Sequence, residues 1–267
     1  MSWLGKMIGG TIGFALGGPL GAVAGAAFGH TFVDKKEQVY LSSRPGTQNT
    51  LSSNEEAQLV FFTAAFSMLA KISKADGNVT KNEISAVEKF MRQDLGLDLN
   101  SQHTAINIFR QAIDSNENFD AFAIQFYSVF RAQPNIIELM MDVLLRVSVA
   151  DGSISTEEEA LLLSATRIFH YPSADYARLK SKYVKETNKY YAVLKCDEAS
   201  SNDEIKKQYR KLVTEYHPDK IEAKGLPEEF IKFANDKFKE IQEAYDNIKQ
   251  ERAFSARPKT GHFIFFC

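Results

Sequence analysis

The chain has 267 residues, of which 44% are hydrophobic and 25% charged, and this composition excludes a largely disordered protein. A formal net charge of −2 gives no overall attraction to nucleic acid, so we expect no nucleic-acid partner and only local basic sites. The two cysteines, Cys196 and Cys267, lie far apart, which argues against a disulfide framework or a zinc site and favours a reducing compartment.

An uncharged run of 27 residues separates Lys6 from Asp34. At about 1.5 Å per residue, a helix of this length can cross a hydrocarbon core of roughly 30 Å. The run predicts a transmembrane helix over residues 7–30, preceded by a short segment of residues 1–6. A cleaved signal peptide that ends near Ala24-Gly25-Ala26 is the alternative.

Glycine recurs at every fourth position of this run. Residues four apart share one face of a helix, and a face of small residues lets two helices approach closely in lipid. We therefore expect the segment to form a homodimer through Gly5, Gly9, Gly13, Gly17, Gly21, Gly25 and Gly29. Because glycine costs nearly 1 kcal/mol in a soluble helix, the alternative is a hairpin or interfacial segment broken at Gly17-Gly18-Pro19.

The middle of the chain is predicted to be a helical domain. Residues 31–54 form a linker, since residues 41–54 are rich in Ser, Thr, Asn, Pro and Gly. Over residues 55–185, apolar residues recur at three- and four-residue steps, for example at Leu59, Phe62 and Phe66. No sustained alternation predicts strands, so we expect an all-α chain.

Two similar segments, residues 75–83 and 150–158, lie 75 residues apart in this domain. Each begins with Ala-Asp-Gly and continues with a polar residue (Asn78 or Ser153), an apolar residue, then Thr or Ser, and a Glu three residues after that. An Asp-Gly pair turns the chain with glycine at positive φ. The Thr/Ser-x-x-Glu spacing predicts a capping box at the start of the next helix.

This duplicated pattern resembles the TerB-like domain, an all-α family with a repeated helix-loop-helix. In that family, acidic residues at these positions are associated with divalent cations, and the matching positions are Asp76, Glu83, Asp151 and Glu158. Each is also explained by a turn or a cap, and one acidic pair per loop falls short of the roughly six oxygen ligands of a calcium loop. We expect no metal or other cofactor, and these four residues are the candidate ligands should a cation bind.

Residues 188–252 predict a helical hairpin after a short apolar helix around Tyr191. Its first long helix has a core face of Ile205, Tyr209, Leu212 and Tyr216 and carries Lys206, Lys207, Arg210 and Lys211 on its remaining surface. Proline stops this helix at His217-Pro218-Asp219. A loop of residues 221–226 follows, and Pro227 opens a second long helix. We expect its apolar stripe to be buried against the first helix; the stripe consists of Phe230, Phe233, Ala234, Phe238, Ile241, Ala244 and Tyr245.

This segment resembles a J domain. The matching features are Tyr-Tyr-x-Val-Leu at residues 190–194, Tyr-Arg-Lys-Leu at 209–212, His-Pro-Asp-Lys at 217–220, and the apolar residues Phe238, Ile241, Ala244 and Tyr245. The resemblance implies a partner, an ATP-bound DnaK-type chaperone whose ATP hydrolysis the domain stimulates. It assigns the trigger to His217, Pro218 and Asp219, and electrostatic docking to Lys206, Lys207, Arg210 and Lys211.

The order of the three regions is similar to that of the membrane chaperones of the DjlA type from Gram-negative bacteria. The resemblance implies a regulatory co-chaperone, not an enzyme, with a single span in the cell inner membrane. Because DnaK-type chaperones are cytosolic, the domains would face the cytoplasm and the N-terminus the periplasm. The tail, residues 253–267, has no counterpart in this resemblance.

An alternative function is a membrane-attached interaction or divalent-cation-sensing module in which the TerB-like domain is the working part. An enzyme has little support, because His103, His170 and His262 have no nucleophile or metal-ligand companions in the sequence. The client proteins and the size of the oligomer do not follow from the sequence.

Overall fold

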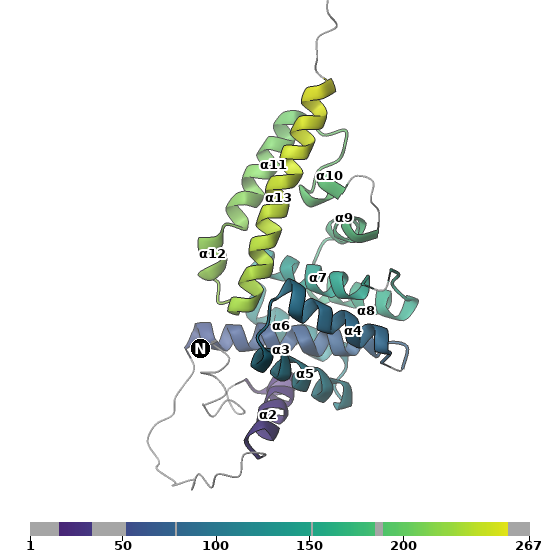
Figure 1. Ribbon diagram of the computed structural model, residues 1–267, viewed down its shortest axis with the longest axis vertical. Coiled ribbons are helices and arrows are strands. Elements are labelled where there is room, and N and C mark those ends of the chain that lie inside the picture. Colours follow the sequence, from purple (N-terminus) through teal and green to yellow (C-terminus); the bar gives the residue numbers. More distant parts are fainter. Residues whose placement is uncertain (1–15, 34–51, 78, 151, 185–188, 256–267) are drawn as a thin grey trace, which may run out of the picture.

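The computed structural model describes residues 16–33, 52–77, 79–150, 152–184 and 189–255. Within these ranges every regular element is helical, which confirms the all-α prediction. A bundle contains α2 (Gly18–Val33), α3 (Ser53–Ser73), α4 (Lys81–Lys89), the π-helical η2 (Phe90–Asp94), α5 (Leu99–Asp114), α6 (Phe119–Phe130), α7 (Pro134–Ser148), α8 (Thr156–Ile168) and α9 (Ser173–Val184). The C-terminal part contains α10 (Lys189–Val193), α11 (Asn202–Glu215), α12 (Pro218–Glu222) and α13 (Glu228–Ser255), and rises from the bundle as a long hairpin (Figure 1).

Helix α3 is the centre of the bundle. Every residue from Leu59 to Ala70 is buried, as expected of a helix that is surrounded on all sides. Helices α5, α6 and α7 contact it most extensively. Phe61 of α3 meets Phe126 and Phe130 of α6 edge-on, with ring centroids 5.7 and 5.9 Å apart.

The two repeated segments fold as their sequence predicts. Gly77 and Gly152 lie at φ values of 103° and 102°, in the positive-φ region that glycine adopts without strain. Thr80 and Glu83 form a capping box at the start of α4, and Ser155 and Glu158 form one at the start of α8. The duplication therefore consists of two equivalent turns, each followed by a capped helix.

Helix α2 covers part of the predicted transmembrane segment and lies against α3, α5 and α6. Residues 1–15, and with them Gly5, Gly9 and Gly13, lie outside the described residues. The buried side of α2 consists of Leu20, Val23, Ala24 and Ala27, with Gly21 also buried. The helix begins only at Gly18, and both Gly17 and Gly18 have positive φ.

The start of α2 is fixed by one side chain of α6. The amide of Gln125 accepts from the backbone N–H of Leu20 at 2.9 Å and donates to the carbonyl oxygens of Leu16 and Gly17. Leu16 and Gly17 therefore lie before the helix, and Gly18 and Pro19 form its first turn. The transmembrane helix over residues 7–30 stays a prediction, because residues 1–15 lie outside the described residues. In the part of the chain that the structure describes, no helix meets the length and hydropathy of a membrane span.

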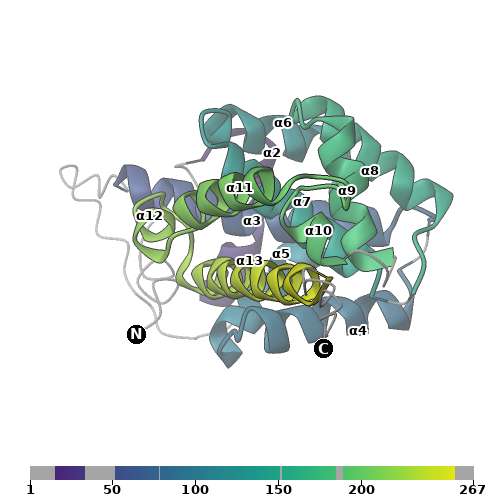
Figure 2. The same cartoon turned by 90° about the horizontal axis from the view of Figure 1, so that it is seen from above.

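Helices α11 and α13 run side by side in both views (Figures 1 and 2). Ile205 and Leu212 of α11 and Ile241 and Ala244 of α13 are buried between them or against α10. Tyr209 stacks on Tyr245 with ring centroids 4.0 Å apart and planes 8° apart.

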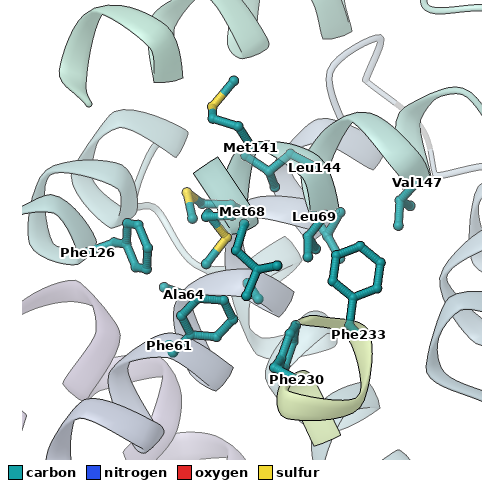
Figure 3. Packing of buried hydrophobic residues seen from close by; sticks show 14 of the residues in the cluster. Phe61, Ala64, Met68, Leu69, Phe126, Met141, Leu144, Val147, Phe230 and Phe233 are labelled. Carbon is teal, nitrogen blue, oxygen red and sulfur yellow. The ribbon is translucent and has the colours of Figure 1, made fainter. Parts of the chain in front are cut away.

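The beginning of α13 is buried in the bundle rather than against α11. Phe230 lies 4.7 Å from the ring of Phe61, 6.2 Å from Phe62 and 6.5 Å from Phe90. Phe233 also belongs to this buried cluster, and Figure 3 shows its ring beside Leu69 of α3. The expectation that the whole stripe of α13 faces α11 is thus wrong for Phe230 and Phe233, because this first part of α13 extends beyond the hairpin contact and onto α3 and η2.

Buried charges join the same two parts. Lys237 of α13 places its Nζ atom 2.8 Å from Oδ2 of Asp142 and 3.3 Å from Oε1 of Glu138, both on α7. Lys182 of α9 lies 3.4 Å from Asp142 and 2.7 Å from Glu240 of α13. Lys195, which follows α10, also pairs with Glu138.

The pKa values of these groups reflect the balance between burial and charge. Burial alone would raise the pKa of Asp142, but the ammonium groups of Lys182 and Lys237 outweigh it and hold that pKa well below its usual value. The pKa of Glu138 is also lowered, since Lys237 and Lys195 outweigh its burial. The pKa of Lys237 is raised, because Asp142, Tyr216 and Glu138 outweigh the effect of its burial. All of these groups are therefore charged at neutral pH.

Acid should weaken the fold through Asp142 and Glu138. Their folded pKa values are lowered, so their stabilisation is present above the ordinary values of about 4 and is lost as pH falls below them. The raised pKa of Lys237 keeps its contribution until pH rises above about 10.4. We expect Asp142→Asn to lower the free energy of unfolding by about 3–5 kcal/mol at pH 7. In urea unfolding from pH 7 to pH 2.5, the variant should also lose less stability on acidification (the acid limb of the profile) than the wild type does. An unchanged acid limb would contradict this assignment.

The capping boxes also make a testable contribution to stability. Ser155→Ala removes the side chain that accepts from the N–H of Glu158, and we expect a loss of about 1 kcal/mol in urea unfolding. Thr156→Ala, one residue later and exposed, is the matched control with an expected change within about 0.5 kcal/mol. Equal losses in the two variants would show that the cap is not the cause.

Candidate functional site

The tip of the hairpin is built from the end of α11 and the short helix α12. Helix α11 ends at Glu215, and His217 becomes the N-cap of α12, with Pro218 in its first turn. The Nδ1 atom of His217 accepts from the backbone N–H of Asp219 at 3.3 Å. Proline favours the first turn of a helix and needs no N–H partner there, so a helical turn forms where the sequence predicted the end of a helix followed by a loop.

The tip presents polar side chains to solvent. The side chain of His217 is 47% exposed and that of Asp219 89% exposed, with Nδ1 and Oδ2 3.7 Å apart. Because Nδ1 accepts a backbone hydrogen bond, the neutral ring carries its proton on Nε2 and can donate from there. The edge of the ring meets Phe238 of α13 at a centroid distance of 6.1 Å, which supports the imidazole from below.

The four predicted basic residues lie together on α11. Lys206 and Arg210, and likewise Lys207 and Lys211, are four positions apart, so they form two neighbouring rows. All four are exposed, opposite the buried Ile205 and Leu212. Among the residues that the structure describes, Lys211 is the one member of this set that forms an ion pair, with Glu215 at 3.9 Å, and that contact is exposed. The rows therefore carry positive charge that is available to an acidic partner and that leads along α11 toward the tip.

The TerB-like turns bring two of the four candidate metal ligands to one place. Glu83 and Glu158 line the same small cavity, together with Ser73 and Ser148. Members of each pair are 75 residues apart, the spacing of the sequence repeat, so the cavity lies between equivalent positions of the two halves. The sequence identified the two glutamates but not their convergence, which depends on how the repeats pack.

The two glutamates of this cavity already accept hydrogen bonds from the protein backbone. Glu83 already accepts from the N–H of Thr80 at 2.6 Å, and Glu158 accepts from the N–H of Ser155 at 2.8 Å. Asp76 is exposed, and Asp151 lies outside the described residues. Among residues with a described position, no group of three or more His, Cys, Asp or Glu side chains could hold a metal ion. The carboxylates act as helix caps in this geometry.

Comparison with known families supports the same three-part organisation. Family models match for the co-chaperone DjlA transmembrane domain over residues 1–49, for the tellurite resistance protein TerB over residues 62–181, and for the DnaJ domain over residues 189–253. The exposed His-Pro-Asp tip lies in the last of these. The chain is thus a J-domain protein with a TerB-like middle domain.

Comparison with curated relatives shows which family of J-domain proteins the chain resembles. The co-chaperone protein DjlA of Coxiella burnetii is 31% identical over 95% of this chain and 99% of its own length. The proteins of the same name from Shewanella oneidensis and Escherichia coli K12 are 28% and 29% identical, each over 76% of this chain and over 82% and 83% of their own lengths. The chain belongs to the DjlA co-chaperone family, as its sequence indicated. No solved structure matches it.

Membership of this family indicates a regulatory, non-catalytic role and association with a membrane. The J domain is the part that accounts for the co-chaperone role.

Proposed function

We propose that this protein is a membrane-anchored co-chaperone that binds a DnaK-type chaperone through its J domain and stimulates ATP hydrolysis by that partner. One observation carries the proposal. The basic rows of α11 and the His217-Pro218-Asp219 tip are exposed on one continuous hairpin, so a single partner surface can contact both.

The two parts of this surface have different physical roles. Exposed cations such as Lys207 and Lys211 attract an acidic surface over several ångströms and raise the rate of encounter. Asp219 then offers a carboxylate that can accept hydrogen bonds from cationic or amide groups of the partner, while Nε2 of His217 offers a donor. New hydrogen bonds at the tip change the polar network of the partner, in which the hydrolysis of ATP takes place.

We propose that the glycine-rich segment anchors the chain as a single span in the bacterial inner membrane, with residues 1–6 periplasmic. The TerB-like domain (55–185) and the J domain (188–252) would then be cytoplasmic, where a DnaK-type partner and ATP are found. The four-residue spacing of the glycines supports a homodimer through this segment. The match of residues 1–49 to a transmembrane domain supports the anchor itself.

Replacing the histidine of the tip should abolish function without affecting the fold. We expect full-length His217→Gln in lipid nanodiscs to lose at least 90% of the stimulation of steady-state DnaK ATPase. The fold should be unaffected, because the exposed ring contributes little to packing. Lys249→Gln, an exposed change on α13, is the control and should retain it. Absence of stimulation by the folded wild type would refute the proposal for that partner.

Reversing charge on α11 should weaken the interaction rather than the trigger. We expect Lys207→Glu combined with Lys211→Glu to raise the half-maximal co-chaperone concentration roughly tenfold at low salt, since steering depends on net charge. The difference from wild type should shrink as salt is added, because exposed charges are screened. Lys249→Glu is the matched reversal elsewhere on the hairpin. A loss that is independent of salt would contradict electrostatic docking.

A further inference from the structure

The TerB-like domain contacts the residues that flank the His-Pro-Asp tip. Tyr216, the residue before His217, is fully buried, and Nζ of Lys237 lies 5.2 Å from the centre of its ring. The side-chain amide of Asn135, at the start of α7, donates to the carbonyl oxygen of Glu215 at 3.5 Å and accepts from Lys224. Contacts from the middle domain thus reach the residues on either side of the tip.

Further contacts continue along the same boundary. Gln58 of α3 donates to the carbonyl oxygen of Leu226 at 3.3 Å, and Lys232 of α13 donates to that of Gln93 at 2.9 Å. Between them, Phe230 fills the aromatic cluster of α3 and η2. The boundary is therefore apolar at its centre and polar on both sides, as in a stable protein interface.

The buried cation determines the register of this boundary. Lys237 is 9% exposed and its partners Glu138 and Asp142 at most 8%, so none of the three can exchange its partner for bulk water while the domains are in contact. An apolar contact alone would tolerate small slides of α13 over α3. A buried ammonium between two carboxylates does not, because a slide leaves an unpaired charge in the interior.

Docking leaves the partner-binding surface open. His217 and Asp219 remain 47% and 89% exposed, and the basic rows of α11 are exposed along their length. The main contacts of α11 are with α13 rather than with the bundle. The hairpin contacts the bundle through Lys224, Leu226 and the beginning of α13, and these contacts leave the basic rows and the tip side chains exposed.

We propose that the J domain acts on its chaperone partner from this docked position, with Lys237, Glu138 and Asp142 as positioning residues that fix the direction of the tip. The inference rests on the proposed function. It adds that the TerB-like domain and the J domain work as one rigid body, so the middle domain sets the direction in which the trigger faces.

A reversible cross-link tests whether the docked form is active. A Cβ atom at Gly225 would lie 3.2 Å from Cβ of Ala57 in α3, close to the roughly 3.5–4.5 Å of a disulfide. Ala57→Cys with Gly225→Cys is made in full-length protein in nanodiscs that also carries Cys196→Ser and Cys267→Ser. We expect an intrachain disulfide on oxidation, and DnaK ATPase stimulation within twofold of the reduced form.

Two results would overturn the inference. One is failure of the disulfide to form in a folded protein, and the other is loss of stimulation on oxidation that returns on reduction. Gly225→Cys alone, in the same background, controls for strain at a residue whose φ is +71°. A third result is that the disulfide forms, but neither the oxidised nor the reduced variant stimulates the ATPase, and the control does not stimulate it either. In that case the proposed function fails, whereas the docked geometry stands.

A second variant tests the positioning residue itself. Lys237→Met removes the buried charge, and Lys249→Met makes the same change on the exposed side of α13. We expect Lys237→Met to raise the half-maximal co-chaperone concentration at least threefold with an unchanged maximal stimulation, since the tip is intact but less well oriented. Backbone amide exchange at Phe230 and Tyr216 should accelerate at least tenfold in this variant only. Unchanged exchange and unchanged half-maximal concentration would contradict a positioning role.

Discussion

A single ammonium group, Nζ of Lys237, lies between two carboxylates that belong to another domain. Taking any one of these three charges out of water is unfavourable by several kcal/mol, and their mutual contact offsets part of that cost, together with the pairs that Lys182 and Lys195 form with the two carboxylates. Separation of the two domains is therefore unfavourable. Glu138 and Asp142 lie in the buried, otherwise mainly apolar helix α7. Without Lys182 of α9, Lys195 after α10 and Lys237 of α13, they would have no cationic partner inside the protein.

The aromatic cluster and the ion network contribute in different ways to this arrangement. Phe230 supplies non-directional attraction, which for a fully buried side chain of its size is on the order of 1.5–3 kcal/mol. The ion network supplies direction, because its distances are satisfied in one register only. Tyr216 is buried beside Lys237 of this network and is followed directly by the exposed His217. The buried position of Tyr216 therefore restrains the backbone at the exposed His217.

Local features of this protein could be predicted from its sequence. The two Ala-Asp-Gly turns, their capping boxes and the stop at Pro218 depend on residues within a few positions of one another, and all are found in the structure. The exposed basic rows also follow from helical spacing alone. In each of these cases the deciding interaction is between neighbours in the chain, so one sequence is sufficient.

Features that depend on distant contacts were not predicted. Phe230 continues the apolar stripe of α13, and periodicity says that it is buried but not whether α11 or α3 buries it. Lys237 has the spacing of an ordinary charged residue on a helix. Its signal was indirect and lay on α7, where Glu138 and Asp142 stand among apolar residues and require buried cationic partners. The convergence of Glu83 and Glu158 likewise arises from the packing of the two repeats.

The position of α2 has a consequence for the membrane. Its apolar stripe, Leu20, Val23, Ala24 and Ala27, is covered by α3, α5 and α6. Hydrocarbon chains and these helices compete for the same four side chains, so insertion into the bilayer and adhesion to the bundle are mutually exclusive states of one helix. Departure of α2 would uncover the faces of α3, α5 and α6 that it covers. The bundle would then expose apolar side chains that α2 covers in the structure.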